Sequence, residues 1–184
     1  WAFKDHGKSF DAVYNRKHEP GFRWLHESFG TNWRLPEVQS AIGRHQLRKM
    51  DAWHAARTRN AEAILDSCRN TTVLRVPDVP EHIEHAWYKC YVFVRPECMK
   101  DDWSRDRLMV EIVQRGVPCY TGSSSEIYLE KAFDGTGWRP AGRLPVVREL
   151  GETSLMFLVH PTLTAQEIEK TQTVISEVCR SAQK

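Results

Sequence analysis

An amide, a guanidinium and the start of a helix follow one another closely near the beginning of the chain. Residues 30–36 read Gly-Thr-Asn-Trp-Arg-Leu-Pro, and Glu37 follows with apolar residues at helical spacing behind it. Side-chain amides and guanidinium groups donate hydrogen bonds to phosphate oxygens, and a helix N-terminus favours a negative charge. The segment suggests that Asn32 and Arg34 contact an anion, although a turn amide beside a surface arginine would have the same spacing.

Other chemical motifs are incomplete in this chain. The segment His82-Ile83-Glu84-His85 lacks the spacing of a zinc-protease signature, and no glycine-rich phosphate loop is present. No serine lies in a Gly-x-Ser-x-Gly elbow. His160 precedes Pro161 at the end of an apolar run, where a structural role suits it better than a catalytic one. We therefore expect no metal site and no hydrolase chemistry.

Composition narrows the class of protein. With 184 residues, 41% of them hydrophobic, the chain is long enough for one domain with a real core, with or without an extra arm. The net charge of +2 builds no strong field, which argues against a nucleic-acid or membrane-surface partner. The five cysteines are odd in number and scattered, so we expect reduced core thiols and a cytoplasmic location.

Hydrophobic periodicity predicts an α+β fold for the chain. Residues 1–35 are irregular, and a long helix, broken or curved, is expected from Pro36 to about Asn70. Further helices and strands alternate after it, and Thr164 with Glu167 has the form of a capping box. The order predicts a small, mainly antiparallel sheet with helices against one face. The expected strands are 72–76, 86–95, 117–120 and 154–159, and the expected helices are 103–115, 127–133, 144–150 and 165–181.

Residues 30–41 closely resemble a segment of the DegT/DnrJ/EryC1/StrS sugar aminotransferases, Gly-x-Asn-x-Arg-(Met/Leu)-x-Glu-(Leu/Val)-Gln-(Ala/Ser)-Ala. Residues 4–7, Lys-Asp-His-Gly, resemble the family's Arg-x-His-Gly. The resemblance continues almost to the end of the chain, in the same order and with the same spacing. It includes residues 46–51, 57–61, 87–92, 114–117, 144–150 and 154–168.

The resemblance implies the C-terminal domain of a fold-type-I enzyme that depends on pyridoxal 5'-phosphate. Such enzymes aminate nucleotide-linked keto-sugars in polysaccharide or glycoside biosynthesis. The family's Schiff-base lysine lies upstream of the His-Gly element and has no counterpart here. We therefore expect residues 1–35 to be an arm from the end of a missing N-terminal domain and residues 36–184 to be the small domain. The fragment alone should hold no catalytic residue, bind no cofactor and be inactive.

The resemblance also assigns roles to individual residues. Asn32 matches the residue that reaches the cofactor phosphate of the other subunit in a homodimer, and Arg34 has a supporting or substrate-side role. The family's Tyr-x-Pro-Leu-His-like segment, which faces the sugar, is replaced by residues 119–128, which lack the histidine. Tyr120, Ser123 and Ser125 are therefore candidates for binding a nucleotide-sugar in an altered pocket. A serine-rich surface loop is the alternative.

Two other functions stay open at this point. The chain could be a non-catalytic binding or assembly module that has kept the domain. The whole protein could also be a pyridoxal-dependent sugar dehydratase, in which a histidine takes the place of the Schiff-base lysine. The upstream coding sequence would decide between these functions.

Overall fold

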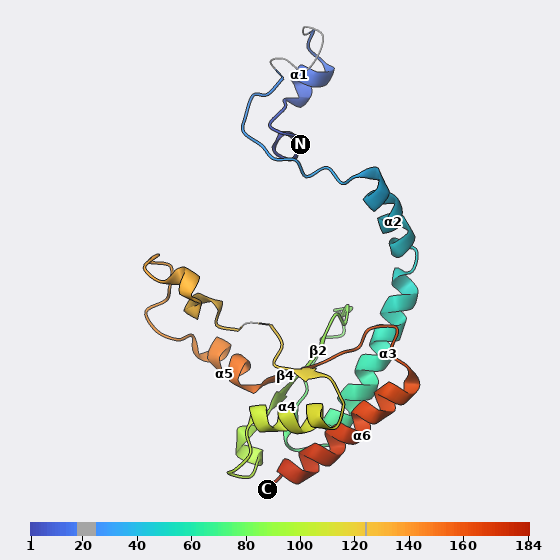
Figure 1. Cartoon of the computed structure of the whole chain (residues 1–184), viewed down its shortest axis with the longest axis vertical. Coiled ribbons are helices and arrows are strands. Elements are labelled where there is room, and N and C mark those ends of the chain that lie inside the picture. The colour runs from blue at the N-terminus through green and yellow to red at the C-terminus, as the bar shows by residue number, and fades with distance from the viewer. Residues whose placement is uncertain (18–24, 124) are drawn as a thin grey trace. The chain divides into compact units, whose positions relative to one another are not determined.

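The computed structural model describes residues 1–17, 25–123 and 125–184. They form two compact units, Trp1–Met50 and Asp51–Lys184 (Figure 1). The expected division after residue 35 concerns the architecture of the whole polypeptide and stays a prediction. None of the helices in the described ranges combines the length and the apolar character that a membrane-spanning helix needs.

The second unit is built on a four-stranded sheet in the order β1-β2-β4-β3, and every neighbouring pair is antiparallel. The central strand β4 is buried along its whole length, which explains its continuous apolar run. In β2, buried residues alternate with half-buried ones, so that one face of the sheet is covered and the other is partly open. The strands are β1 (Leu74–Arg75), β2 (Cys90–Val94), β3 (Cys119–Tyr120) and β4 (Ser154–Phe157).

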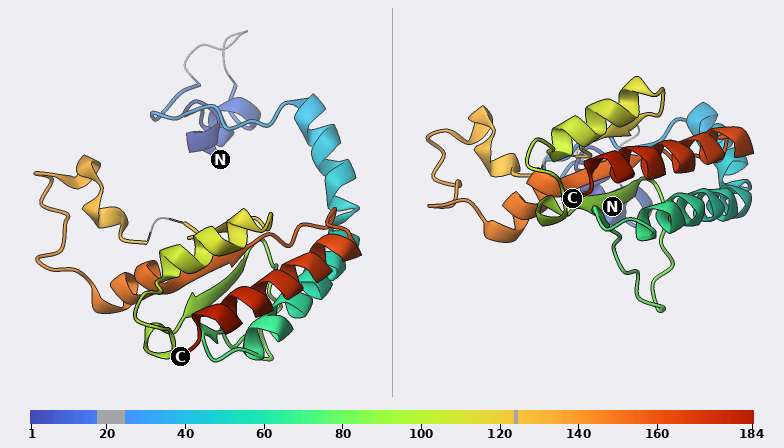
Figure 2. Two further views of the ribbon diagram at one scale, coloured as in Figure 1. Left: turned by 60° about the horizontal axis from the view of Figure 1, so that its bottom comes forward. Right: turned by 90° about the horizontal axis from the view of Figure 1, so that it is seen from below.

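Helices complete the core of this unit. Helix α6 (Ala165–Ala182) lies alongside α3 (Met50–Arg69) in both views of Figure 2, and Gln172 Nε2 donates to the carbonyl oxygen of Ala63 across this contact at 2.8 Å. Helix α6 also packs against α4 (Arg105–Gln114). Helix α5 (Pro145–Thr153) leads directly into β4. These helices and the antiparallel sheet confirm the predicted α+β fold class.

The long helix predicted from Pro36 to Asn70 is interrupted at Arg48 and Lys49. Its first part is α2 (Glu37–Leu47). At the break, Lys49 N–H donates to the carbonyl oxygen of Gln46 at 2.9 Å, which is the i to i−3 bond of a 3-10 turn and not the i to i−4 bond of an α-helix. No residue of α2 is buried. Its apolar side, which includes Val38 and Ile42, is exposed.

The predicted cap at Thr164 is confirmed, whereas several short elements differ from the predictions. The Thr164 hydroxyl accepts from Glu167 N–H, and the Glu167 carboxylate accepts from Thr164 N–H, which completes the predicted capping box. The expected helix 127–133 is instead two single turns of 3-10 helix. The short helices are η1 (Ala2–Lys4), α1 (Phe10–Tyr14), η2 (Pro96–Cys98), η3 (Ile127–Leu129) and η4 (Lys131–Phe133).

All five cysteines are free thiols, as predicted, and only Cys98 is partly exposed. Burial raises the pKa of Cys90, Cys119 and Cys179 to about 12 each and that of Cys68 well above its ordinary value. Because the thiolate is the reacting form, Ellman's reagent at pH 8 should modify Cys98 alone in the native protein.

A Cys98→Ser variant should then show no fast-reacting thiol, while all the remaining thiols react in denaturant. Rapid native modification of a second cysteine would contradict this burial.

Candidate functional site

Two sequence motifs lie side by side in the first unit. Backbone hydrogen bonds join His6 N–H to Thr31 O (3.0 Å), Thr31 N–H to Phe3 O (2.7 Å) and Trp33 N–H to Lys4 O (3.0 Å). Asp5 and Asn32 form an antiparallel bridge between the same segments. The Lys-Asp-His-Gly and Gly-Thr-Asn-Trp-Arg motifs therefore form one site, although they lie far apart in the sequence.

Two glycines allow this close approach. Gly7 has a φ of +86°, and a Cβ at this position would lie 1.8 Å from the carbonyl oxygen of Ser28. A Cβ on Gly30 would lie 2.3 Å from the backbone nitrogen of Gly7. No other residue fits either position without moving the backbone. The glycines of both motifs therefore serve the pairing of the two segments.

In the side-chain amide of Asn32 the oxygen is hydrogen-bonded and the NH₂ group is available. Its Oδ1 atom accepts from Arg34 N–H at 3.3 Å and from Arg34 Nε at 3.2 Å. Because a backbone N–H can only donate, the oxygen of the amide must face Arg34. The amide NH₂ group then points away on an exposed residue and has no hydrogen-bond partner among the described residues. It can donate to an external anion.

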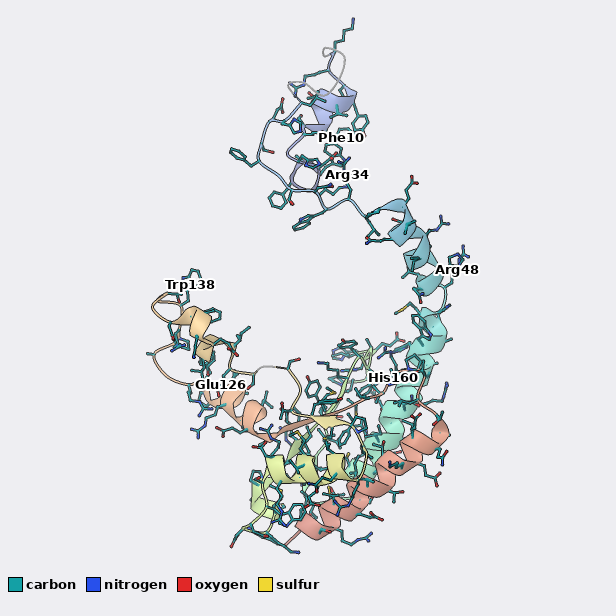
Figure 3. All side chains as sticks on the ribbon, viewed as in Figure 1. Phe10, Arg34, Arg48, Glu126, Trp138 and His160 are labelled. Atoms are coloured by element: carbon teal, nitrogen blue, oxygen red, sulfur yellow. The ribbon has the colours of Figure 1, made fainter. Side chains whose placement is uncertain are left out.

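The guanidinium of Arg34 is held from two further sides. Its Nε atom lies 3.3 Å from Asp5 Oδ1, and its Nη2 atom lies 3.1 Å from His6 Nε2. Figure 3 labels Arg34 within this unit. The sequence spacing predicted Asn32 and Arg34 as site residues, whereas the contributions of Asp5 and His6 were not predicted. The signal that could have found them is their position in the Lys-Asp-His-Gly motif.

The serine-rich loop of the second unit rests on strand β2. Ser123 N–H donates to the Tyr91 hydroxyl at 3.0 Å, and its Oγ atom lies 3.4 Å from that hydroxyl and 3.5 Å from Lys89 Nζ. Burial raises the pKa of Tyr91, but its hydrogen bonds with Ser123 outweigh that effect, so its pKa lies below the ordinary value. Gly122, at φ +93°, packs against the Tyr91 ring. Tyr91 therefore holds the loop in place.

Strand register places two tyrosines on one face of the sheet. Tyr91 of β2 and Tyr120 of β3 both lie opposite Met156 of the intervening strand β4, so the three side chains share a face. Tyr120 is 49% exposed. Ser123 joins this group through Tyr91. Ser125 instead lies against α5, where a Cβ on Gly151 would meet its Oγ atom at 2.1 Å. Ser124 lies outside the described residues.

Interactions of the Glu126 side chain connect the two ends of the segment 126–144. Arg143 forms an ion pair with Glu126, and the Tyr128 hydroxyl donates to Glu126 Oε1 at 2.7 Å. The Arg143 guanidinium and then the Tyr128 hydroxyl lower the pKa of Glu126 to about 2. Figure 3 shows Glu126 next to α5 and Trp138 at the far tip of the segment. This segment is continuous with the serine-rich loop.

The pH dependence of this segment follows from the lowered pKa of Glu126. A Glu126→Gln variant should be cleaved several-fold faster within 126–144 by a protease at neutral pH, because the ion pair with Arg143 is lost. The difference from wild type should be full above pH 4.5, the ordinary glutamate pKa, and should fade as the pH falls toward about 2. Glu130→Gln, an exposed carboxylate in the same segment, is the matched control. Equal cleavage of both variants would contradict this role.

Comparison with known proteins places the chain among aminotransferases. A family model described as the DegT/DnrJ/EryC1/StrS aminotransferase family matches residues 2–178. The chain is similar to a solved aminotransferase from Psychrobacter cryohalolentis, with 54% identity and a TM-score of 0.90, over 99% of this chain and 48% of that one.

Two curated relatives come from Saccharopolyspora erythraea and Streptomyces venezuelae. The chain is 28% identical to the erythromycin biosynthesis sensory transduction protein EryC1 of Saccharopolyspora erythraea, over 78% of this chain and 37% of that protein. It is 27% identical to the dTDP-3-amino-3,4,6-trideoxy-alpha-D-glucose transaminase of Streptomyces venezuelae, over 77% of this chain and 35% of that protein. The chain thus spans well under half the length of these curated relatives.

Proposed function

The chain belongs to the DegT/DnrJ/EryC1/StrS aminotransferase family, and on this premise we propose that it is the C-terminal part of a pyridoxal-phosphate-dependent sugar aminotransferase. The amino acceptor would be a nucleotide-linked keto-sugar. The relative from Streptomyces venezuelae, a transaminase named for a dTDP-linked amino sugar, supports this substrate class. The proposal assigns the Schiff-base lysine to another part of the polypeptide, since no lysine here matches its position. The enzyme would be a cytoplasmic homodimer.

The available amide of Asn32 is the observation that carries the proposal. Pyridoxal phosphate, when bound, supplies the electron sink that amino transfer requires. Its phosphate needs hydrogen-bond donors, and Asn32 offers an exposed NH₂ group whose orientation Arg34 fixes from the other end. The buried carboxylate of Asp5 would repel a phosphate, but it faces Arg34. The residues present therefore fit the group, with Asn32 donating to it across the dimer and Arg34 in support.

The proposed sugar-binding surface is the partly open face of the sheet. Tyr120 and Ser123 carry hydroxyl groups there, and Tyr91 and Lys89 fix the position of Ser123. Hydroxyl groups donate and accept hydrogen bonds, which suits the hydroxyl groups of a sugar. Ser125 would contact the substrate from the α5 end of the same loop.

Mass spectrometry of the reaction products tests the function. The full-length polypeptide is incubated with L-glutamate and a panel of UDP- and dTDP-linked keto-sugars. The proposal predicts an aminated nucleotide-sugar together with an equal amount of 2-oxoglutarate, and no turnover by the 184-residue chain alone. A deoxygenated keto-sugar product without amination would indicate a dehydratase instead. A full-length protein that binds no pyridoxal phosphate would indicate a non-catalytic module.

A further inference from the structure

His6 and Asp5 have no role in the function proposed above, yet both touch Arg34. We propose that they are positioning residues, which hold the Arg34 guanidinium so that Arg34 in turn aims the Asn32 amide at a phosphate. The inference rests on the proposed function and extends it to the Lys-Asp-His-Gly motif. It predicts that removing a contact to Arg34 weakens phosphate binding although no phosphate-contacting group is lost.

The first step of the argument concerns the donors of Arg34. Its backbone N–H and Nε donate to Asn32 Oδ1, and Nε also faces Asp5 Oδ1. Its Nη2 reaches His6 Nε2 at 3.1 Å. A planar guanidinium held at two of its nitrogens cannot rotate freely. The network therefore fixes the guanidinium through Nε and Nη2, and the amide NH₂ of Asn32 is a donor that this arrangement leaves available for a ligand.

The second step concerns the contact and the backbone of His6. Because Arg34 Nη2 can only donate, His6 Nε2 is the acceptor of this hydrogen bond. His6 also has a φ of +61°, in the sparsely populated left-handed region. Its backbone is held there by the bond from His6 N–H to Thr31 O and by the adjacent Gly7. A conformation of this kind at a residue with a specific contact points to a function for that contact.

The third step concerns Asp5. Asp5 is 8% exposed, and its Oδ1 atom has no hydrogen-bond partner in the described part of the chain. Burial of a carboxylate is unfavourable unless a cation compensates it, and the Arg34 guanidinium, 3.3 Å away, is that cation. Asp5 thereby keeps Arg34 against the backbone pairing of the two segments.

Two substitutions of His6, by side chains of equal length, distinguish a positioning role from a structural role. His6→Gln keeps an acceptor oxygen within reach of Arg34, whereas His6→Met has the same length without a strong acceptor. Both place an ordinary side chain at the same left-handed backbone position, so their cost to folding is matched. The full-length dimer is used, and the readouts are the dissociation constants for pyridoxal phosphate and for phosphate-free pyridoxal, together with the melting temperature.

The expected result is a loss that is specific for the phosphate. His6→Met should weaken pyridoxal phosphate about tenfold, the equivalent of one hydrogen bond, with pyridoxal unchanged. His6→Gln should stay within about twofold of wild type, since it restores the acceptor. Arg34→Lys keeps the charge but lacks the second nitrogen, so it should behave like His6→Met.

Several outcomes would overturn the inference. Equal weakening of both ligands by His6→Met, or equal behaviour of Met and Gln at this position, would show a structural role. If Asn32→Ala loses the preference for the phosphorylated ligand while His6→Met keeps it, the positioning role fails and the proposed function stands. If Asn32→Ala also keeps that preference, the phosphate contact itself is wrong.

Discussion

Replacing Asn32 with alanine in the full-length dimer is expected to weaken pyridoxal phosphate by about 10- to 100-fold. Hydrogen bonds to charged groups contribute roughly 1.5–3 kcal/mol, and each ~1.4 kcal/mol corresponds to a factor of ten in affinity. The variant removes the NH₂ donor and leaves the Arg34 donors without their acceptor. The dissociation constant is measured by titrating the apoenzyme and following the absorbance of the bound cofactor.

Asn15→Ala is the matched control for this measurement. Asn15 is an exposed asparagine of the same unit, and among the described residues its side chain bonds to nearby Asp11 at 3.1 Å. It should leave cofactor affinity unchanged. A similar affinity for both variants and wild type would remove the support for a phosphate contact at Asn32.

Replacing Phe157 with alanine is expected to lower the free energy of unfolding by about 3–5 kcal/mol. Phe157 is fully buried in β4 and lies opposite both Cys90 and Cys119 in the sheet. A loss of this size is a large fraction of the ~5–15 kcal/mol that stabilises a typical domain. Denaturant unfolding of the 184-residue chain, followed by circular dichroism, measures it.

Tyr88→Ala removes an aromatic ring that is 76% exposed and should cost less than about 1 kcal/mol. Comparable losses for the two variants would contradict the assignment of β4 as the centre of the core.

Much of the fold could be predicted because the signals are local. The apolar run of β4, the aromatic and β-branched residues of β2 and the cap at Thr164 are properties of short stretches of sequence, and the structure contains both strands and the cap. The interruption at Arg48 and Lys49 is different. Those residues are compatible with a helix, so their local preference gave no position for the break.

The candidate sites depend on contacts between distant residues, which spacing alone could not provide. Asn32 and Arg34 are two positions apart, and their contact is local. His6 reaches Arg34 only because backbone pairing aligns the two segments. Tyr91 similarly shares a face with Tyr120, on the other side of Met156, only through the register of both strands with β4. The domain boundary and the roles of Tyr120, Ser123 and Ser125 stay predictions.

Subunit complementation is the most direct test of the central claim, that Asn32 serves the cofactor phosphate of the neighbouring subunit. Full-length Asn32→Ala protein is mixed with a variant lacking the Schiff-base lysine, the dimers are exchanged, and transamination is assayed at a cofactor concentration too low to fill the Asn32→Ala sites. Each heterodimer then has one intact site, so random pairing should restore about a quarter of wild-type activity. If the mixture stays as inactive as the separate variants, Asn32 does not act across the dimer and the account is contradicted.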